Sequence, residues 1–305
     1  MNFEIKQKSI LSSDGKNTLS GVMYIPEGEI RAVFHLVHGM TEYINRYNRL
    51  LSALATAGYL CVGFDNLGHG NTAKEGDLGF IAEKDGWSYM VDDVKRFADE
   101  VKSEYPNLPY YLMGHSMGSF ITRTAISRYP DIADKYICCG TGGANPFASV
   151  GLLICDIIKA FRGSRAISPF IENMAFGAYN KRFDGDTNYE WLTKDRNVIE
   201  KYSKDRFCTF HFTVSAMHDL IKLNKVCNSK KCFENTKKDL PILIVSGDMD
   251  PVGNYGKGVT QVYNKFKASG NKNVTMFLYK DCRHEIHNDT CAEQMTEDIL
   301  KFLAC

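Results

Sequence analysis

Leu108-Pro-Tyr-Tyr-Leu-Met-Gly-His-Ser-Met-Gly-Ser-Phe120 is the stretch that decides the fold of this chain. Residues 110–113 form a compact apolar and aromatic run, which predicts a buried strand. Residues 114–118 fit the pattern G-x-S-x-G, and residues 119–129 predict a helix that stops before Pro130. Strand, tight turn and helix in this order are the context that a nucleophile elbow requires.

The residue types in this turn have physical reasons. A serine on so sharp a turn has a strained backbone, and Gly114 and Gly118 leave room where the strand and the helix pass closely. The start of a helix also favours negative charge that develops beside the serine hydroxyl. The same pattern also occurs in glycine-rich turns that only pack, so the flanking strand and helix are what make Ser116 the predicted nucleophile.

Composition narrows the class of protein. The chain has 305 residues with 44% hydrophobic content, enough for one large α/β domain with an insertion. The net charge of +1 gives no sign of a nucleic-acid partner. The ten cysteines include no C-x-x-C pair, and the histidine pairs lack further ligands, so we expect neither a metal site nor a cofactor.

The first residues of the chain and its cysteines indicate the cellular compartment in which the protein is expected. Residues 1–6 do not resemble a signal peptide, and no apolar stretch approaches the roughly 20 residues that span a bilayer. Several cysteines lie in apolar runs, where they are expected to be buried free thiols. We therefore expect a cytoplasmic protein, with peripheral membrane contact as an open alternative.

Apolar periodicity predicts alternating strands and helices. Further strands are predicted at residues 3–11, 19–24, 32–37, 59–64, 136–139, 241–245 and 274–279, and helices at residues 47–57, 87–105, 259–266 and 292–303. The first two strands should pair as an antiparallel edge, and the alternation predicts a mostly parallel sheet. Residues 145–239 break this alternation and read as helices, so we predict a core of residues 1–144 and 240–305 with a helical cap between them.

A serine nucleophile needs a base, and the base needs an orienting carboxylate. Asp248 and Asp250 follow one predicted strand, and His284 and His287 follow the next. We favour Asp250 because it lies deeper in its loop and Pro251 fixes the local geometry, with Asp248 as the brace of that turn. We favour His284 as the base, and expect His287 to be a surface residue.

A tetrahedral intermediate also needs an oxyanion hole, which backbone amides supply in such sites. One amide comes from Met117, the residue after the nucleophile. The other is expected from Met40, because Gly39 lets the loop after the strand at residues 32–37 turn an amide inward.

Together these motifs resemble a known family. The segments His38-Gly-Met-Thr-Glu42, Asp65-Asn-Leu-Gly-His-Gly70, Gly114-His-Ser-Met-Gly118, Gly247-Asp-Met-Asp250 and His284 are similar to those of α/β-hydrolases of the monoacylglycerol lipase and lysophospholipase type. The resemblance spans nearly the whole chain in motif order. It implies the α/β-hydrolase fold, a triad of Ser116, Asp250 and His284, and a two-step acyl transfer to water. Where the family has arginine in the first glycine-rich loop, this chain has Leu67.

The predicted cap bears on the substrate. Residues 147–161 are strongly apolar and read either as a cap helix packed on the body or as an exposed lip that enters a lipid interface. An apolar roof over Ser116 favours a fatty-acyl ester, with a monoacylglycerol or lysophospholipid as the leading substrate class.

Two other functions stay open at this point. A proline iminopeptidase of the same fold would need acidic cap residues to bind a free amino terminus, and the candidates are Glu172, Asp184, Asp186 and Glu190. A noncatalytic binding module is the second alternative, although such modules often lose a triad member. A haloalkane dehalogenase is disfavoured because it needs aspartate where Ser116 stands.

Overall fold

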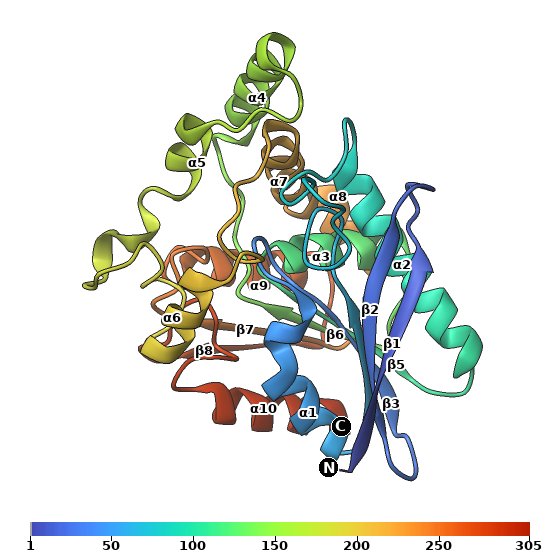
Figure 1. Ribbon diagram of the computed structural model, residues 1–305. Coiled ribbons are helices and arrows are strands. Elements are labelled where there is room, and N and C mark those ends of the chain that lie inside the picture. Colours follow the sequence, from blue (N-terminus) through green and yellow to red (C-terminus); the bar gives the residue numbers. More distant parts are fainter. Residues whose placement is uncertain (1) are drawn as a thin grey trace.

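A single twisted sheet organises the molecule (Figure 1). The computed structural model describes residues 2–305. Eight strands lie in the order β1-β2-β4-β3-β5-β6-β7-β8, and all neighbours from β4 to β8 are parallel. The strands are β1 (Phe3–Leu11), β2 (Thr18–Pro26), β3 (Ala32–Val37), β4 (Tyr59–Phe64), β5 (Tyr110–His115), β6 (Lys135–Cys139), β7 (Ile242–Gly247) and β8 (Val274–Tyr279).

The first two strands form the antiparallel edge that the sequence predicts. β1 pairs with β2, and β2 pairs antiparallel with β4. β3, β4, β5 and β7 are buried on both faces, which explains why each reads as an unbroken apolar run rather than an alternating one.

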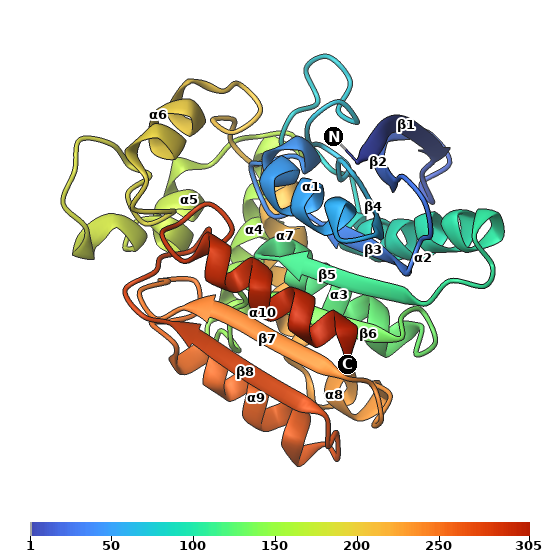
Figure 2. The same cartoon turned by 90° about the horizontal axis from the view of Figure 1, so that it is seen from below.

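Helices cover both faces of the sheet, and side chains that alternate along each strand divide between two cores. Val33 and Leu112 pack toward one face with α2 (Gly86–Glu104), α3 (Met117–Arg128) and α9 (Lys257–Ala268). Phe34 and Met113 pack toward the other face with α1 (Asn48–Thr56) and α10 (Ala292–Ala304). Figure 2 shows α1 and α10 together in front of the strands. This arrangement confirms the predicted fold class, a mostly parallel sheet flanked by helices.

The segment between β6 and β7 is helical. It contains α4 (Ala148–Arg162), α5 (Pro169–Phe176), α6 (Arg196–Lys204), α7 (Val214–Cys227) and α8 (Lys230–Asn235), with a short 3₁₀ turn, η2 (Tyr179–Arg182). Its one β-bridge joins Ile167 to Thr213. In Figure 1, α4 and α5 form the end of the molecule farthest from α1 and α10. The limits of a separate cap at residues 145 and 239 stay a prediction.

α4 covers most of residues 147–161 and has one buried face and one exposed apolar face. Its small residues Ala148, Gly151 and Cys155 are buried, and a β-carbon on Gly151 would contact Ile221 of α7. Several of its large apolar side chains face outward, with Leu153 59% exposed and Phe161 87% exposed, whereas Ile154 and Ile158 are partly buried. Within residues 2–305, no helix has the length and apolar character needed to cross a bilayer. All ten cysteines are free thiols.

Candidate active site

Ser116 lies on the turn between β5 and α3, as the G-x-S-x-G pattern predicts. Its φ of 53° and ψ of −121° are strained for a residue with a side chain. The turn is so tight that a β-carbon on Gly114 would overlap the carbonyl oxygen of Gly118. Ser116 donates its backbone N–H to Cys139 of β6 at 3.0 Å, which fixes the turn against the neighbouring strand.

Asp250 and His284 meet at the carboxyl ends of β7 and β8. The distance from His284 Nδ1 to Asp250 Oδ2 is 2.9 Å, and both residues are buried. Asp250 also accepts the Val252 N–H at 2.8 Å and the Ser246 hydroxyl at 3.3 Å, so its carboxylate has a fixed orientation. A carboxylate at Nδ1 makes that nitrogen the donor and leaves Nε2 free to act as a base.

The alternative carboxylate lies elsewhere. Asp248 accepts the backbone N–H of Asp281 at 2.7 Å and so ties the loop after β7 to the turn after β8. The structure therefore brings Asp250, and not Asp248, to the imidazole of His284.

Met40 and Met117 flank Ser116 on the same cavity wall. The loop of Met40 is close to the nucleophile, because a β-carbon on Gly39 would lie 2.9 Å from Cβ of Ser116. Among residues 2–305, no protein acceptor takes the backbone N–H of Met40 or of Met117. Both amides are thus available to an oxyanion at Ser116.

Glu42 holds this loop from behind, a role that we did not predict although the residue stands in the quoted His38–Glu42 segment. Its Oε1 accepts the Gly39 N–H at 2.5 Å and the Tyr47 hydroxyl at 2.7 Å. Arg46 donates to Glu42 and makes a bidentate pair with Glu285. Burial disfavours charge on Glu42, but His115 and Arg46 outweigh it and lower the pKa of the carboxyl.

His115 links this group to the loop that carries His284. Its Nδ1 lies 3.2 Å from Glu42 Oε1 and 2.7 Å from the Tyr47 hydroxyl, and its Nε2 lies 3.2 Å from the carbonyl oxygen of His284. Burial opposes a charge on the ring, but Glu42 outweighs burial and raises the pKa of His115. Both nitrogens of a charged ring donate, which suits acceptors on both sides.

The position of His287 differs from the one that the sequence predicted. We predicted a surface residue, but only 3% of His287 is exposed. Its ring stacks on Tyr47 at 4.3 Å and lies edge-on to His115 at 4.9 Å. The prediction was wrong because His287 lies on a turn that folds under the site, while the sequence suggested only a position one helical turn beyond His284.

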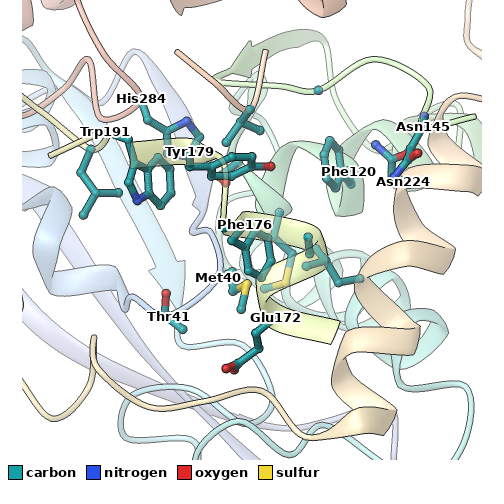
Figure 3. A pocket seen from close by; sticks show the side chains of 18 of the residues that line it. Met40, Thr41, Phe120, Asn145, Glu172, Phe176, Tyr179, Trp191, Asn224 and His284 are labelled. Atoms are coloured by element: carbon teal, nitrogen blue, oxygen red, sulfur yellow. The ribbon is translucent and has the colours of Figure 1, made fainter. Parts of the chain in front are cut away.

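A cavity of about 890 Å³ joins these residues (Figure 3). Ser116, His284, Met40 and Met117 line it, and Asp250 lies behind His284. Much of the remaining wall is apolar and comes from the core and from residues 145–239: Phe120, Phe176, Met217, Leu220 and Ile221. Residues 2–305 contain no group of three or more His, Cys, Asp or Glu placed to hold a metal ion.

A strained serine at an elbow, a buried Asp–His pair and a helix-flanked parallel sheet define the α/β-hydrolase class of fold. Residues 28–291 match the family described as serine aminopeptidase, S33, and the chain belongs to that family.

The relatives of this chain confirm the predicted resemblance to α/β-hydrolases of the monoacylglycerol lipase type. Monoglyceride lipase of Rattus norvegicus is 23% identical over 87% of this chain and 78% of its own length. Monoacylglycerol lipase of Mycolicibacterium smegmatis is 24% identical over 92% of this chain and 91% of its own.

Solved structures of esterases and lipases have a fold similar to that of this chain. A thermostable carboxyl esterase from Bacillus coagulans, in complex with glycerol, superposes with a TM-score of 0.93 at 28% identity and covers 98% of both chains. A soluble variant of monoglyceride lipase from Saccharomyces cerevisiae, in complex with a substrate analogue, has a TM-score of 0.77 at 18% identity, over 99% of this chain and 95% of its own. The second likeness supports the fold.

Proposed function

We propose that the protein is a serine hydrolase that cleaves carboxylic esters of apolar acyl groups, with monoacylglycerols as the leading substrate and lysophospholipids as the next. The observation that carries this proposal is the placement of Ser116 and His284 on one cavity whose wall includes a cluster of large apolar side chains, with Asp250 hydrogen-bonded behind His284. The names of the relatives, which are monoglyceride lipases and a carboxyl esterase, support the same chemistry.

The proposed reaction proceeds in two acyl transfers. His284 Nε2 removes the proton of the Ser116 hydroxyl, and the serine oxygen attacks the ester carbonyl. The oxyanion that forms accepts hydrogen bonds from the backbone N–H groups of Met40 and Met117. The imidazolium, stabilised by Asp250, then protonates the leaving alcohol as the C–O bond breaks and an acyl-serine forms. Water repeats the sequence, releases the carboxylic acid and restores the serine.

The aminopeptidase alternative has less support. Of the four acidic candidates, only Glu172 lines the cavity, and its carboxylate lies 2.9 Å from Nδ1 of His211. Glu190 is buried and pairs with Arg196 at 3.1 Å. The other carboxylates on the cavity wall, Glu42 and Glu285, are paired with Arg46. Among residues 2–305, Glu172 is thus the one carboxylate on the cavity wall without an arginine or lysine partner, so a free amino terminus would depend on this single side chain.

An ester panel tests the proposal. Wild type and Ser116→Ala are offered p-nitrophenyl esters from acetate to decanoate, 1-monooleoylglycerol, lysophosphatidylcholine and a prolyl aryl amide. Because each buried methylene is worth up to about 0.8 kcal/mol, kcat/KM should rise several-fold with each pair of methylenes. Ser116→Ala should lose ester hydrolysis and labelling by a fluorophosphonate. A flat profile from acetate to decanoate, or faster cleavage of the amide, would overturn the assignment.

We also propose that α4 and α5 meet the surface on which a lipid substrate is presented. The two helices, with the residue before α4, carry large exposed apolar side chains: Phe147, Val150, Leu153, Ile157, Phe161, Phe170 and Met174. Arg162, at the end of α4, is exposed and suits acidic headgroups. Apolar side chains clustered at one end of a molecule mark a site of interaction rather than scattered surface residues.

A further inference from the structure

Residues 190–194 run along the loop that carries His284. His284 donates its backbone N–H to the carbonyl of Trp191 at 3.3 Å, and Glu285 donates to the carbonyl of Leu192 at 2.7 Å. The Arg283 guanidinium, on the residue before His284, donates to the carbonyl oxygens of Glu190 and Thr193. Four hydrogen bonds thus join this segment to three consecutive residues around the proposed base.

The side chain of Trp191 adds a contact to the imidazole itself. The two rings lie 5.1 Å apart between centroids, with an interplanar angle of 37°. Tyr179 packs on the indole at 5.1 Å and 67°, so the indole contacts both the phenol and the imidazole. Figure 3 shows the three rings close to one another on the same side of the cavity.

This segment is firmly packed, in contrast to α4 and α5. Glu190, Leu192 and Thr193 are at most 3% exposed. Thr193 also donates its hydroxyl to the carbonyl of Asn288 at 3.1 Å, which extends the contact along the loop after His284. Glu190, Leu192 and Thr193 are therefore buried against the loop of the base, while Trp191 is half-buried on the cavity wall and the large exposed apolar side chains lie on α4 and α5.

We propose that Trp191 is a positioning residue for His284, and that Arg283 secures it by tying residues 190–193 to the loop of the base. This inference rests on the proposed function. Asp250 holds the imidazole through Nδ1, and the freedom of the ring to turn about that bond depends on the rings packed against it, which are His115 at 4.7 Å and Trp191 at 5.1 Å between centroids. The indole packed beside the imidazole restricts this turning and so limits the orientations of Nε2 in the cavity that Ser116 also lines. Part of the site that orients the base thus belongs to the segment between β6 and β7.

The expected effect falls on turnover rather than on binding. A displacement of about 1 Å in a catalytic group can cost on the order of 100-fold in rate. Trp191 lines the cavity, so its replacement also touches the substrate, whereas Arg283 does not line the cavity. A loss of kcat on changing Arg283, with KM preserved, separates positioning from substrate contact.

The experiment compares Trp191→Leu, Trp191→Phe and Arg283→Met with wild type. The readouts are kcat and KM for p-nitrophenyl butyrate, the rate constant of fluorophosphonate labelling of Ser116, and Tm. Trp87→Leu is the matched control, because Trp87 is the other tryptophan of the chain and lies on α2 outside the cavity. Its kcat should equal that of wild type.

We expect Trp191→Leu to lower kcat and the labelling rate about 30- to 100-fold, and Trp191→Phe to recover most of the loss because it keeps a flat ring. Arg283→Met should lower kcat about 10-fold with KM unchanged. If Trp191→Leu does not fold, the kcat values of Arg283→Met and Trp191→Phe test the inference instead. Folded Trp191→Leu and Arg283→Met proteins with the kcat of wild type would overturn the inference. A wild type that the fluorophosphonate does not label would instead overturn the proposed function.

Discussion

Asp248 and Asp250 lie two positions apart on one loop and have different partners. Asp250 accepts from His284, and Asp248 accepts from the backbone of Asp281. Replacing Asp250 by asparagine turns an acceptor into a group that can donate, which favours the wrong imidazole tautomer. We expect Asp250→Asn to lower kcat about 10³- to 10⁴-fold.

Asp248→Asn is the control for that change, because an asparagine oxygen can still accept the Asp281 N–H. Its kcat should stay within about threefold of wild type, since no transition-state contact is removed. Steady-state kinetics on one short-chain ester measure both. Equal losses in the two variants would show that the loop as a whole, rather than the carboxylate at 250, supports the base.

At the scale of elements, α4 has one buried face and one exposed apolar face. We expect Leu153→Ser with Phe161→Ser to weaken binding to anionic vesicles by about 10-fold or more, because each large apolar side chain that enters a lipid interface contributes about 1.5–3 kcal/mol when fully buried. Vesicle co-sedimentation measures this, and short-chain ester turnover in the absence of vesicles should stay unchanged.

Phe277→Ser provides the comparison for these α4 variants. Phe277 is also partly exposed, at 41%, but it lies on β8, the last strand of the sheet, away from α4. Its loss should leave vesicle binding intact. Vesicle binding that is equal in wild type and the α4 double variant would contradict the proposed lipid contact.

The strands and the elbow could be predicted because their causes are local. Strands buried on both faces must be apolar throughout, and a strand that turns directly into a helix at Ser116 leaves glycines where no β-carbon fits. The predicted strand at residues 241–245 begins one residue early and ends two short of β7, which is a small error at the ends of an apolar run.

The contacts around the base could not be predicted in this way. Trp191 reaches His284 across 93 positions of chain, and Glu190 is buried against Arg196 although its residue type favours the surface. Such pairs depend on how residues 145–239 fold over the sheet. Periodicity indicates that this segment is helical, but it does not determine which loop faces which.

At the scale of the whole molecule, the interior holds titratable groups whose effects on stability oppose one another. Burial lowers the pKa of His35, His69 and His287 to about 3. Burial also raises the pKa of Asp93 to about 6 and that of Asp219 to about 7. In acid the unfolded chain binds more protons at the histidines, while the folded chain binds more at the carboxyls. The contributions of the histidines and the carboxyls to the pH dependence of the free energy of unfolding therefore cancel in part. The contribution of one group is measured by comparing wild type with a variant that lacks that group.

His287→Leu isolates one of these groups. Neither ring nitrogen of His287 has a hydrogen-bond partner among residues 2–305, so leucine, which has a similar volume, should be nearly neutral for stability at pH 7.5. Because the folded pKa lies below the unfolded value of 6.5, the contribution of His287 to stability is intact above pH 6.5 and is lost as the pH falls toward about 3.

The free energy of unfolding of wild type should consequently fall relative to that of His287→Leu by about 1.4 kcal/mol per pH unit below pH 6.5, reaching about 2–3 kcal/mol at pH 4.5. Urea unfolding of both proteins at pH 7.5, 6.0 and 4.5 measures this difference. Parallel stabilities over that range would mean that His287 takes up its proton as readily in the folded protein as in the unfolded chain, with Glu285 and Glu42 stabilising the charged ring. The buried histidine would then belong to the charged network around Glu42 rather than to the apolar core.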